Sequence, residues 1–564
     1  MMNIKELYDR WIAKGDADTA AELQAIAGDE TEQNERFYRS LEFGTGGLRG
    51  IIGAGTNRMN RYTVRQATQA MANYLIRQGT GDRGVCISYD SRKFSDVFAK
   101  ETACVLAANG IRAYLSDTLR PVPFLSYSVL RFHAAAGVMI TASHNPPKYN
   151  GYKAYCETGE QIAPEMASEI MQEMQQVDVF DDVSVMPMEE ALQKGLIVMM
   201  DEAVETDYLH CVLEQQRHPE IGKNSDLKIV YTPLHGSGNI PVRRALSMAG
   251  FSQVFVVPEQ ELPDPAFSTV KSPNPEDKEG FYLAIPLANQ VGADLIIGTD
   301  PDCDRVGALV RDRKGEFQAL TGNQTGVILL EYLLAGGNVP KNSAVIKTIV
   351  TTYLANAICK RHGITVMDVL TGFKYIGEKI KEFEQTHEYT FLFGFEESYG
   401  YLCGTYTRDK DAVVASMLLA EAAAYYRSQG KSLLDILDEI YQTYGVYQEG
   451  LKAVTMEGME GIQKIKAITA GLRQNPPSDI AGVKITAKED YLIGKRFDQT
   501  GETEITLPKS DVLRFELEDG STFVVRPSGT EPKIKLYFAV IGKEIDETKK
   551  QLVSFQEKVI QEIL

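Results

Sequence analysis

Hydrophobic residues recur along the chain in two alternating patterns. Continuous apolar runs of roughly four to six residues, such as VCISYD from Val85 and ADLIIGT from Ala293, are typical of strands buried on both faces of a sheet. Between these runs, apolar residues at three- and four-residue spacing predict amphipathic helices, as in SDVFAKETACVLAANG from Ser95. The alternation predicts α/β domains.

The order strand, helix, strand, helix, strand occurs three times, starting at Gly84, Leu227 and Ser343. We therefore predict three similar βαβαβ domains. After about Gly445 the pattern changes to one helix, four strands and a closing helix from Glu544, which predicts an α+β domain. Asp519-Gly520 predicts a tight hairpin between two of those strands.

The chain has 564 residues, too many for one hydrophobic core, because domains beyond roughly 250–300 residues usually divide. We predict five segments. They are a helical N-terminal extension over residues 1–40, α/β domains over 41–205, 206–320 and 321–445, and an α+β domain over 446–564.

A polar loop follows the third strand of each repeat. The loops are Thr141–Pro146, Asp300–Arg305 and Glu396–Gly400. Ligands of open α/β sheets bind beyond the carboxyl ends of strands, so we expect the three loops to share one cleft. The α+β domain carries a fourth polar loop, residues 526–533.

Three aspartates in the second loop, Asp300, Asp302 and Asp304, indicate a metal site. Alternate side chains of a strand lie about 6.6 Å apart, whereas neighbouring ligands of octahedral Mg²⁺ lie about 3 Å apart. The segment must therefore curl into a tight turn. A solvated acidic loop is the alternative. A calcium-binding EF-hand is excluded because Arg305 and Arg311 occupy its glycine and glutamate positions. Cys303 is read as core filler, since Mg²⁺ prefers oxygen.

Ser143 lies at the end of a strand, before Asn-Pro-Pro, on what we expect to be a rigid, exposed turn. That position suits a nucleophile or a phosphoryl carrier, although an ordinary turn serine is also possible. No acidic partner completes a Ser-His-Asp triad with His144.

The two remaining loops suit a sugar phosphate. Guanidinium, hydroxyl and exposed backbone N–H groups make a phosphate cradle, with a polar hairpin end as the alternative. Its members are Arg526, Ser528, Gly529, Thr530 and Lys533. Glu396 and Ser398 suit sugar hydroxyls, and a structural turn explains them nearly as well. Thr371, Gly372 and Lys374 end a neighbouring strand and are predicted to belong to the same pocket.

The net charge of −18 disfavours nucleic acid and anionic lipid as partners, and means that a phosphorylated substrate needs local basic residues. Seven scattered cysteines without paired spacing indicate reduced thiols. The N-terminus lacks the apolar stretch of a signal peptide, and the most apolar helix, 412–426, is interrupted by Glu421. We expect a soluble, cytoplasmic protein without membrane partners.

The four loops, in this order, resemble the α-D-phosphohexomutase superfamily and its phosphoglucomutase/phosphomannomutase branch. The resemblance runs from GTGGLRG at Gly44 to RPSGTEPK at Arg526, and TASHNPPKYNGYK from Thr141 is its most specific motif. It implies three α/β domains and a TATA-binding-protein-like fourth domain around a central cleft. Pro301 and Cys303 stand where many relatives have glycine or alanine.

The resemblance also implies roles for the candidate residues. Ser143 would be a phosphoserine that completes a Mg²⁺ site with Asp300, Asp302 and Asp304. Arg49, His144, Lys153 and Lys410 would surround the transferring phosphoryl group and include the general acid or base. Arg305, Thr371, Gly372, Lys374, Glu396 and Ser398 would bind the sugar, and the Arg526 loop its distal phosphate.

The activity implied is the reversible interconversion of glucose 1-phosphate and glucose 6-phosphate. Glucose 1,6-bisphosphate would serve as intermediate and activator. Mannose or pentose phosphates, or net synthesis of the bisphosphate, remain open on the same scaffold. A phosphatase with an aspartate nucleophile and a catalytically inactive sugar-phosphate-binding protein are two further alternatives. No feature of the sequence sets an oligomeric state.

Overall fold

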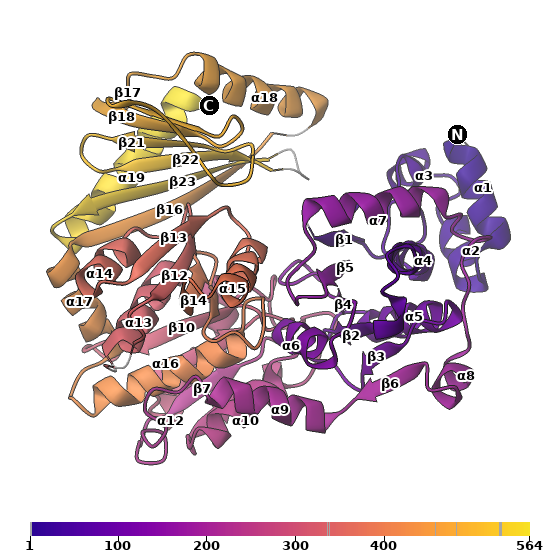
Figure 1. Ribbon diagram of the computed structural model, residues 1–564, viewed down its shortest axis with the longest axis horizontal. Helices are drawn as coiled ribbons and strands as arrows, with labels where there is room; N and C mark the ends of the chain where they lie inside the picture. The colour runs from indigo at the N-terminus through magenta and orange to yellow at the C-terminus, as the bar shows by residue number, and fades with distance from the viewer. Residues whose placement is uncertain are drawn as a thin grey trace. The chain divides into compact units, whose positions relative to one another are not determined.

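The computed structural model describes residues 3–44, 46–335, 337, 339–456, 458–480, 482–528 and 533–564. The chain forms two compact units (Figure 1). Unit 1 comprises Met1–Leu320, Ile376–His387 and Tyr399–Gly430. Unit 2 comprises Thr321–Tyr375, Glu388–Ser398 and Lys431–Leu564.

Unit 1 begins with the predicted helical extension, made of α1 (Ile4–Lys14), α2 (Ala17–Gln24) and α3 (Glu30–Phe37). Asn3 caps α1 with a capping box, in which its side chain accepts from the Glu6 N–H and the Glu6 carboxylate accepts from the Asn3 N–H. The apolar face of α1 buries Trp11, the only tryptophan of the chain, against aromatic rings that include Phe37.

The first sheet of unit 1 has six strands in the order β1-β5-β4-β2-β3-β6. β4, β2, β3 and β6 are parallel, and β1 and β5 join β4 in antiparallel pairing. The strands are β1 (Gly47–Ile51), β2 (Val85–Tyr89), β3 (Ala113–Ser116), β4 (Ala136–Ile140), β5 (Tyr149–Cys156) and β6 (Ile197–Met200). The helices are α4 (Arg61–Arg77), α5 (Ser95–Ala108), α6 (Val122–Phe132), α7 (Pro164–Gln176), α8 (Met188–Gln193) and α9 (Glu202–Leu213).

The second sheet of unit 1 has the order β11-β10-β9-β7-β8, in which β10 and β11 are antiparallel additions. The strands are β7 (Ile229–Thr232), β8 (Val254–Val256), β9 (Leu295–Thr299), β10 (Val306–Arg311) and β11 (Phe317–Ala319). The helices are α10 (Asn239–Met248), α11 (Pro258–Glu261) and α12 (Ala284–Val291), and α16 (Ala412–Arg427) packs on α10.

Unit 2 contains the third repeat and the C-terminal domain. The repeat comprises β12 (Ser343–Thr348), β13 (Thr365–Val369) and β14 (Thr390–Glu396), with β12 between the other two and parallel to both. Its helices are α13 (Gly322–Ala335), α14 (Leu354–His362) and α17 (Leu433–Tyr444), while α15 (Lys374–Thr386) starts in unit 2 and continues in unit 1. The short strand β15 (Gly400–Leu402) belongs to unit 1.

The C-terminal sheet of unit 2 is antiparallel, with the main order β16-β23-β22-β21-β18-β19-β20, and β17 pairs with β18. The strands are β16 (Val446–Thr455), β17 (Asp479–Ile480), β18 (Val483–Asp490), β19 (Lys495–Asp498), β20 (Gly501–Glu504), β21 (Leu513–Leu517), β22 (Thr522–Pro527) and β23 (Lys533–Gly542). Helices α18 (Gly458–Gln474) and α19 (Ile545–Ile563) pack on this sheet (Figure 1).

The predicted α/β class with three similar domains and an α+β domain is confirmed. All three repeats place the third strand beside the first and the first beside the second: β4-β2-β3, β9-β7-β8 and β14-β12-β13. The Asp519-Gly520 hairpin also forms, with Gly520 at φ 83° between β21 and β22. The antiparallel strands β5 and β10 and the long strand β16 were not predicted. The second helical segment of the second repeat is divided into a 3₁₀ turn, Lys278–Phe281, and α12.

Candidate functional site

The predicted polar loops follow the carboxyl ends of parallel strands. In the first repeat, Tyr89 of β2 pairs with Ile140 of β4, so the loops that start at Asp90 and Thr141 leave the sheet side by side. The acidic loop follows β9 in the same way. Unit 1 thus holds the Ser143 loop and the acidic loop, and unit 2 holds Glu396–Ser398 and the Arg526 loop. A cleft shared by all four loops stays a prediction.

The acidic loop curls as its composition requires. The Cys303 N–H donates to the Asp300 carbonyl over 2.9 Å and closes a turn, with Cys303 at φ 52°. Each of the three aspartates offers an oxygen within 4.8 Å of the others. Asp300 and Asp302 have no exposed surface and Asp304 has 2%. Cys303 is buried and not part of this group, in agreement with its reading as core filler.

The acidic cluster fits a divalent cation. The Oδ1 atoms of Asp302 and Asp304 are buried and have no hydrogen-bond partner among the residues that the structure describes. Burial, followed by the neighbouring Asp302 and Asp304, raises the pKa of Asp300 well above its ordinary value. Buried carboxylate oxygens without partners are costly unless a cation neutralises them, and clustered oxygen donors are the ligands of Mg²⁺.

Ser143 lies against this cluster. Its Oγ is 3.2 Å from Asp300 Oδ2 and 3.1 Å from His144 Nδ1. The expectation of an exposed turn was wrong, since Ser143 is only 4% exposed. Its backbone has φ 53°, in the left-handed region that costs a non-glycine residue roughly 1–2 kcal/mol.

Two lysines bring positive charge to the aspartates. Lys153 Nζ lies 2.7 Å from Asp302 Oδ2 and 3.4 Å from Asp304 Oδ2, and Lys410 Nζ lies 3.2 Å from Asp304 Oδ2. Burial opposes ionisation of Asp304, but Lys410, Lys153 and Arg305 lower its pKa well below the ordinary value. Burial likewise opposes the charge of Lys153, but Asp302 and Asp304 raise its pKa, so Lys153 remains a cation near neutral pH.

His144 and Arg49 flank Ser143. Burial, then the charges of Arg305 and Arg49, lowers the pKa of His144 well below its ordinary value, so the ring is neutral near pH 7. Arg49 is exposed on β1, and its Nη1 donates to Asn145 Oδ1 over 3.2 Å. Unit 1 therefore brings together all five residues predicted to act in catalysis.

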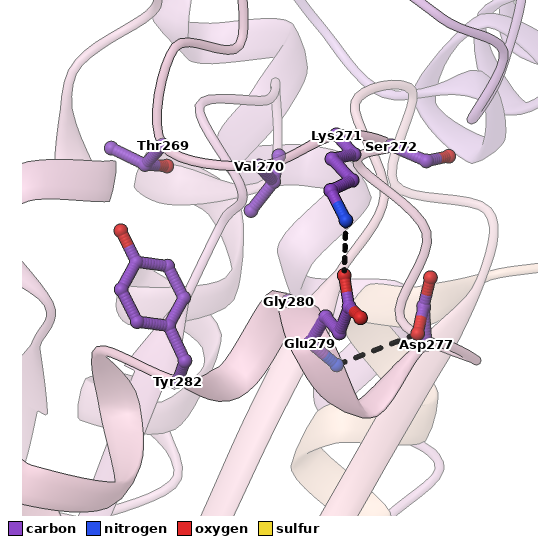
Figure 2. A pocket seen from close by; sticks show the side chains of 8 residues that line it. All are labelled: Thr269, Val270, Lys271, Ser272, Asp277, Glu279, Gly280 and Tyr282. Atoms are coloured by element: carbon purple, nitrogen blue, oxygen red, sulfur yellow. Dashed lines mark hydrogen bonds and ion pairs between the residues drawn. The ribbon is translucent and has the colours of Figure 1, made fainter.

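Arg305, predicted to bind substrate, forms an ion pair with Glu276. Glu276 belongs to the segment 262–281, whose Ser272 Oγ also donates to the His144 carbonyl over 3.0 Å. Together with Tyr282, the same segment lines a cavity of about 290 Å³, where the side chain of Lys271 points toward Glu279 (Figure 2). The residues lining this cavity include none of the predicted site residues.

In unit 2, Glu396 is 7% exposed and its Oε1 accepts the Gly372 N–H over 2.9 Å, so two of the predicted sugar-binding positions are in contact. Gly372 has φ 122°, a conformation that favours glycine. Lys374 is 9% exposed, and its ammonium lies 5.1 Å from the centre of the Tyr375 ring. Ser398 and Thr371 are half-buried beside these groups in the chain.

Tyr537 lies near both the Glu396 loop and Arg526 within unit 2. Burial, then the charge of Glu397, raises the pKa of Tyr537 to about 12. The charge and hydrogen bond of Arg526 lower this pKa, and the charge of Glu396 raises it to a smaller extent. The Ser528 N–H donates to the Lys533 carbonyl over 2.8 Å. Gly529 and Thr530, also predicted to bind phosphate, lie outside the described residues.

Sequence reasoning missed three buried residues behind Ser143, namely Asp90, Arg92 and Thr141. The Thr141 hydroxyl accepts the Ser143 N–H, and Arg92 donates to the Ser143 carbonyl. A signal was available: Asp90 and Arg92 form a polar loop directly after β2, and a first strand that lies beside the third sends its loop to the same edge. Asp409, which accepts from Lys410 Nζ over 3.1 Å, was also missed.

The seven cysteines are free thiols, as predicted. Among the described helices, none combines the length and the apolar character needed to span a bilayer.

Comparison with known proteins gives matches along most of the chain. Four parts of the phosphoglucomutase/phosphomannomutase family match: α/β/α domain I at residues 40–179, domain II at 206–315, domain III at 321–444 and the C-terminal domain at 454–553. A phosphoglucomutase of Staphylococcus haemolyticus is 38% identical over 529 residues, which are 93% of this chain and 95% of the relative.

Solved structures with the same fold include pp63/parafusin, a phosphoglucomutase from Paramecium in an open form. Its TM-score is 0.71 at 17% identity, covering 92% of this chain and 94% of the other. A phosphoglucomutase/phosphomannomutase family protein of Burkholderia thailandensis has a TM-score of 0.66 at 18% identity, covering 92% and 96%. With its four domains matched in order and relatives this similar over almost their full length, the chain belongs to the phosphoglucomutase/phosphomannomutase family.

Proposed function

We propose that this chain is a phosphoglucomutase that interconverts glucose 1-phosphate and glucose 6-phosphate through a phosphoserine at Ser143. The observation that carries the proposal is the position of the Ser143 hydroxyl, 3.2 Å from Asp300 in a buried acidic cluster that two lysines also contact. The relatives that match over nearly the whole chain are named phosphoglucomutases.

Asp300, Asp302, Asp304 and the phosphate on Ser143 would hold Mg²⁺, which when bound neutralises the charge that develops on the transferring phosphoryl group. The Oδ1 atoms of Asp302 and Asp304, which have no hydrogen-bond partner among the described residues, support this assignment.

Residues of unit 1 carry out the phosphoryl transfer. A sugar hydroxyl attacks the phosphorus on Ser143 Oγ and gives its proton to a nearby base. The bond between Oγ and phosphorus breaks, and Oγ takes up a proton that restores the serine hydroxyl. Lys153 and Lys410 place positive charge where the equatorial oxygens of the phosphoryl group gain negative charge. His144 and Arg49 flank the serine, and His144, neutral near pH 7, can accept a proton.

The product of the first transfer is glucose 1,6-bisphosphate. It must turn over so that its other phosphate faces Ser143 and can return to the serine. We assign the sugar hydroxyls to Glu396 and Ser398 and the distal phosphate to Arg526, Ser528 and Thr530. The same three phosphate-binding residues then bind whichever phosphate is distal, because both orientations present one phosphate away from the serine.

Intact mass spectrometry tests the proposal directly. Incubation with glucose 1,6-bisphosphate and Mg²⁺ should add one phosphate, removable by excess glucose 1-phosphate and absent in Ser143→Ala. A coupled assay should give higher kcat/KM for glucose 1-phosphate than for mannose or ribose 1-phosphate. An adduct on an aspartate, or no adduct at all, would sink the proposal.

A further inference from the structure

The loop after β2 reaches both main-chain polar groups of Ser143, the carbonyl directly through Arg92 and the N–H by way of Thr141. Residues 90–94 leave the sheet beside the Ser143 loop because Tyr89 and Ile140 are register partners. Asp90 and Arg92 of this loop are 2% and 3% exposed. Neither is expected to touch substrate, yet both are ionisable side chains held in the interior, where such groups need a specific partner.

Arg92 spans the Ser143 loop from one end to the other. Its Nη2 donates to the carbonyls of Ser143 and Asn145, and its Nη1 donates to the carbonyls of Pro146 and Tyr149, both over 3.1 Å. The loop contains Pro146 and Pro147, which lack N–H groups, and its own turn hydrogen bonds go to the carbonyls of Ala142 and Pro146. Among the described residues, no backbone turn bond reaches the carbonyls of Ser143 and Asn145. One guanidinium supplies four donors instead.

Asp90 reaches the other side of Ser143 through Thr141. The Thr141 hydroxyl donates to Asp90 Oδ2 over 2.6 Å and accepts the Ser143 N–H over 2.8 Å. Asp90 Oδ1 accepts from the Ser95 hydroxyl over 2.8 Å and from the Arg92 N–H over 3.0 Å, which fixes the carboxylate. The N–H and the carbonyl of Ser143 are therefore both held by residues that lie two positions apart in the chain.

The Arg92 guanidinium is itself fixed by Phe267 of the second repeat and by Asp90. The buried Phe267 ring lies 5.0 Å from Arg92 Cζ, and Asp90 Oδ2 lies 3.3 Å from Arg92 Nε. Such stacking on a ring face adds an attractive contact that depends on orientation. Arg92 thus has a single supported geometry.

We propose that Asp90 and Arg92 are positioning residues that keep Ser143 in its left-handed conformation, with the hydroxyl facing Asp300. A strained backbone conformation persists only where surrounding contacts enforce it, and these contacts hold both sides of the residue. The inference rests on the proposed function of Ser143. We call these contacts of Asp90 and Arg92, including the link through Thr141, the clamp. Its loss lets the backbone of Ser143 relax and moves Oγ away from the acidic cluster.

Arg92→Lys is the first test, because lysine keeps the charge but cannot reach four carbonyls. We expect kcat to fall about 100-fold, as a misplacement near 1 Å can cause, with KM for glucose 1-phosphate changed less than about threefold. Hydrogen exchange of residues 141–149 should become faster.

Arg311→Lys is the matched control. Arg311 also donates to several backbone carbonyls and rests on a ring, with its Cζ 4.3 Å from the Phe317 centre, but it lies at the far end of β10 from the acidic loop. It should leave kcat and the exchange of residues 141–149 at wild-type values.

Thr141→Val is the second test and carries less risk for folding, since valine has nearly the same shape. It removes the hydroxyl between Asp90 and the Ser143 N–H, so kcat should fall while KM is kept. Thr141→Ser retains the hydroxyl and should restore most of the loss.

The outcomes separate this inference from the proposed function. Wild-type protein without a phosphate adduct would overturn the proposed function, while faster exchange of residues 141–149 in Arg92→Lys would still support the clamp. Wild-type kcat and unchanged exchange in Arg92→Lys, or equal losses in Thr141→Val and Thr141→Ser, would overturn the clamp.

Discussion

At the scale of single residues, Ser143 combines a strained backbone with a reactive position. It is nearly buried, has φ 53°, and faces Asp300 through its hydroxyl. Strained backbone conformations are frequent at functional sites, where the surrounding contacts enforce the geometry that the function needs. Substitutions at this residue can therefore separate stability from activity.

Ser143→Ala and Ser143→Gly should both abolish turnover and phosphate uptake. Glycine adopts positive φ without penalty, so the free energy of unfolding of Ser143→Gly should exceed that of Ser143→Ala by about 1 kcal/mol. The greater conformational entropy of glycine in the unfolded chain reduces this difference. Urea denaturation measures the difference. A glycine variant clearly less stable than the alanine variant would show that the φ value carries no strain.

The acidic cluster predicts a stability that depends on Mg²⁺. Binding to the native state alone should raise the free energy of unfolding by about 2.7 kcal/mol at a concentration 100 times Kd. Asp302→Asn should remove most of this increase and most of the activity. Thermal denaturation of chelator-treated protein, with and without Mg²⁺, measures it.

Asp312→Asn serves as the control for that experiment. Asp312 is a half-buried acidic residue of the same domain, in the turn between β10 and β11. It should respond to Mg²⁺ as the wild type does. An equal response in Asp302→Asn would place the cation elsewhere.

The chemistry of the three aspartates could be predicted from their spacing, because carboxylates so close together repel one another unless a cation neutralises them. The place of Asp90 and Arg92 beside the site could be inferred from their loop after β2, but their hydrogen bonds could not, since these go to carbonyls of a loop some fifty residues away. A sequence shows which hydrogen-bond donors a side chain carries, but not which distant backbone carbonyls need a donor.

At the scale of elements, the N-terminal helix α1 is joined to its domain by a salt bridge and an aromatic cluster. Arg10 Nη2 lies 2.7 Å from Asp178 Oδ1, and Trp11 packs edge-on against Tyr62 and Phe180. The Arg10 hydrogen bond, more than other contacts, lowers the pKa of Asp178 to about 2.

This shift predicts how the docking of α1 depends on pH. A lowered pKa stabilises the folded state fully above the ordinary value near 4, and this contribution is lost as the pH falls toward 2. The emission of Trp11 should shift to longer wavelength over that interval. Asp178→Asn should show part of the shift already at pH 7 and a weaker pH dependence below 4.

Asp226→Asn is the control, since it breaks the ion pair with Arg427, which is remote from α1 in the sequence. Its Trp11 emission should follow the wild type at every pH. Identical emission of Asp178→Asn and wild type from pH 7 to 2 would contradict the assignment.

The parallel strands of all three repeats could be predicted because each is a continuous apolar run. The antiparallel strand β5 could not, because Asn150, Gly151 and Lys153 interrupt its apolar pattern. One of these residues serves the site, since Lys153 extends from β5 to Asp302. The lysine that helps to make β5 hard to recognise as a strand is the residue that this strand brings to the acidic cluster.

At the scale of the whole molecule, unit 2 joins the third repeat to the C-terminal domain. An apolar cluster crosses the boundary, formed by Ile349, Leu370, Tyr491, Val512, Val524 and Tyr537. Beside it, Tyr353 of the repeat lies between two cations, with Lys347 Nζ 4.0 Å and Arg514 Cζ 4.7 Å from the ring centre. Lys347 has no exposed surface and pairs with Asp368.

Tyr353→Leu should loosen this junction. Removing the ring deletes two cation–π contacts worth about 0.5–2 kcal/mol each, so hydrogen exchange should become faster in both β12 and β21. Tyr353→Phe keeps the ring and should exchange nearly as the wild type does. Faster exchange confined to β12 would mean that the ring does not connect the two domains.

The division of the chain between the units has a consequence for engineering and for evolution. The serine, the acidic cluster and the lysines belong to one unit, while the loops assigned to the sugar and its distal phosphate belong to the other. Substrate choice can then change by substitutions within 321–375, 388–398 and 431–564 while the transfer chemistry stays intact. A library confined to those segments should yield variants with altered sugar preference that still take up phosphate on the same serine.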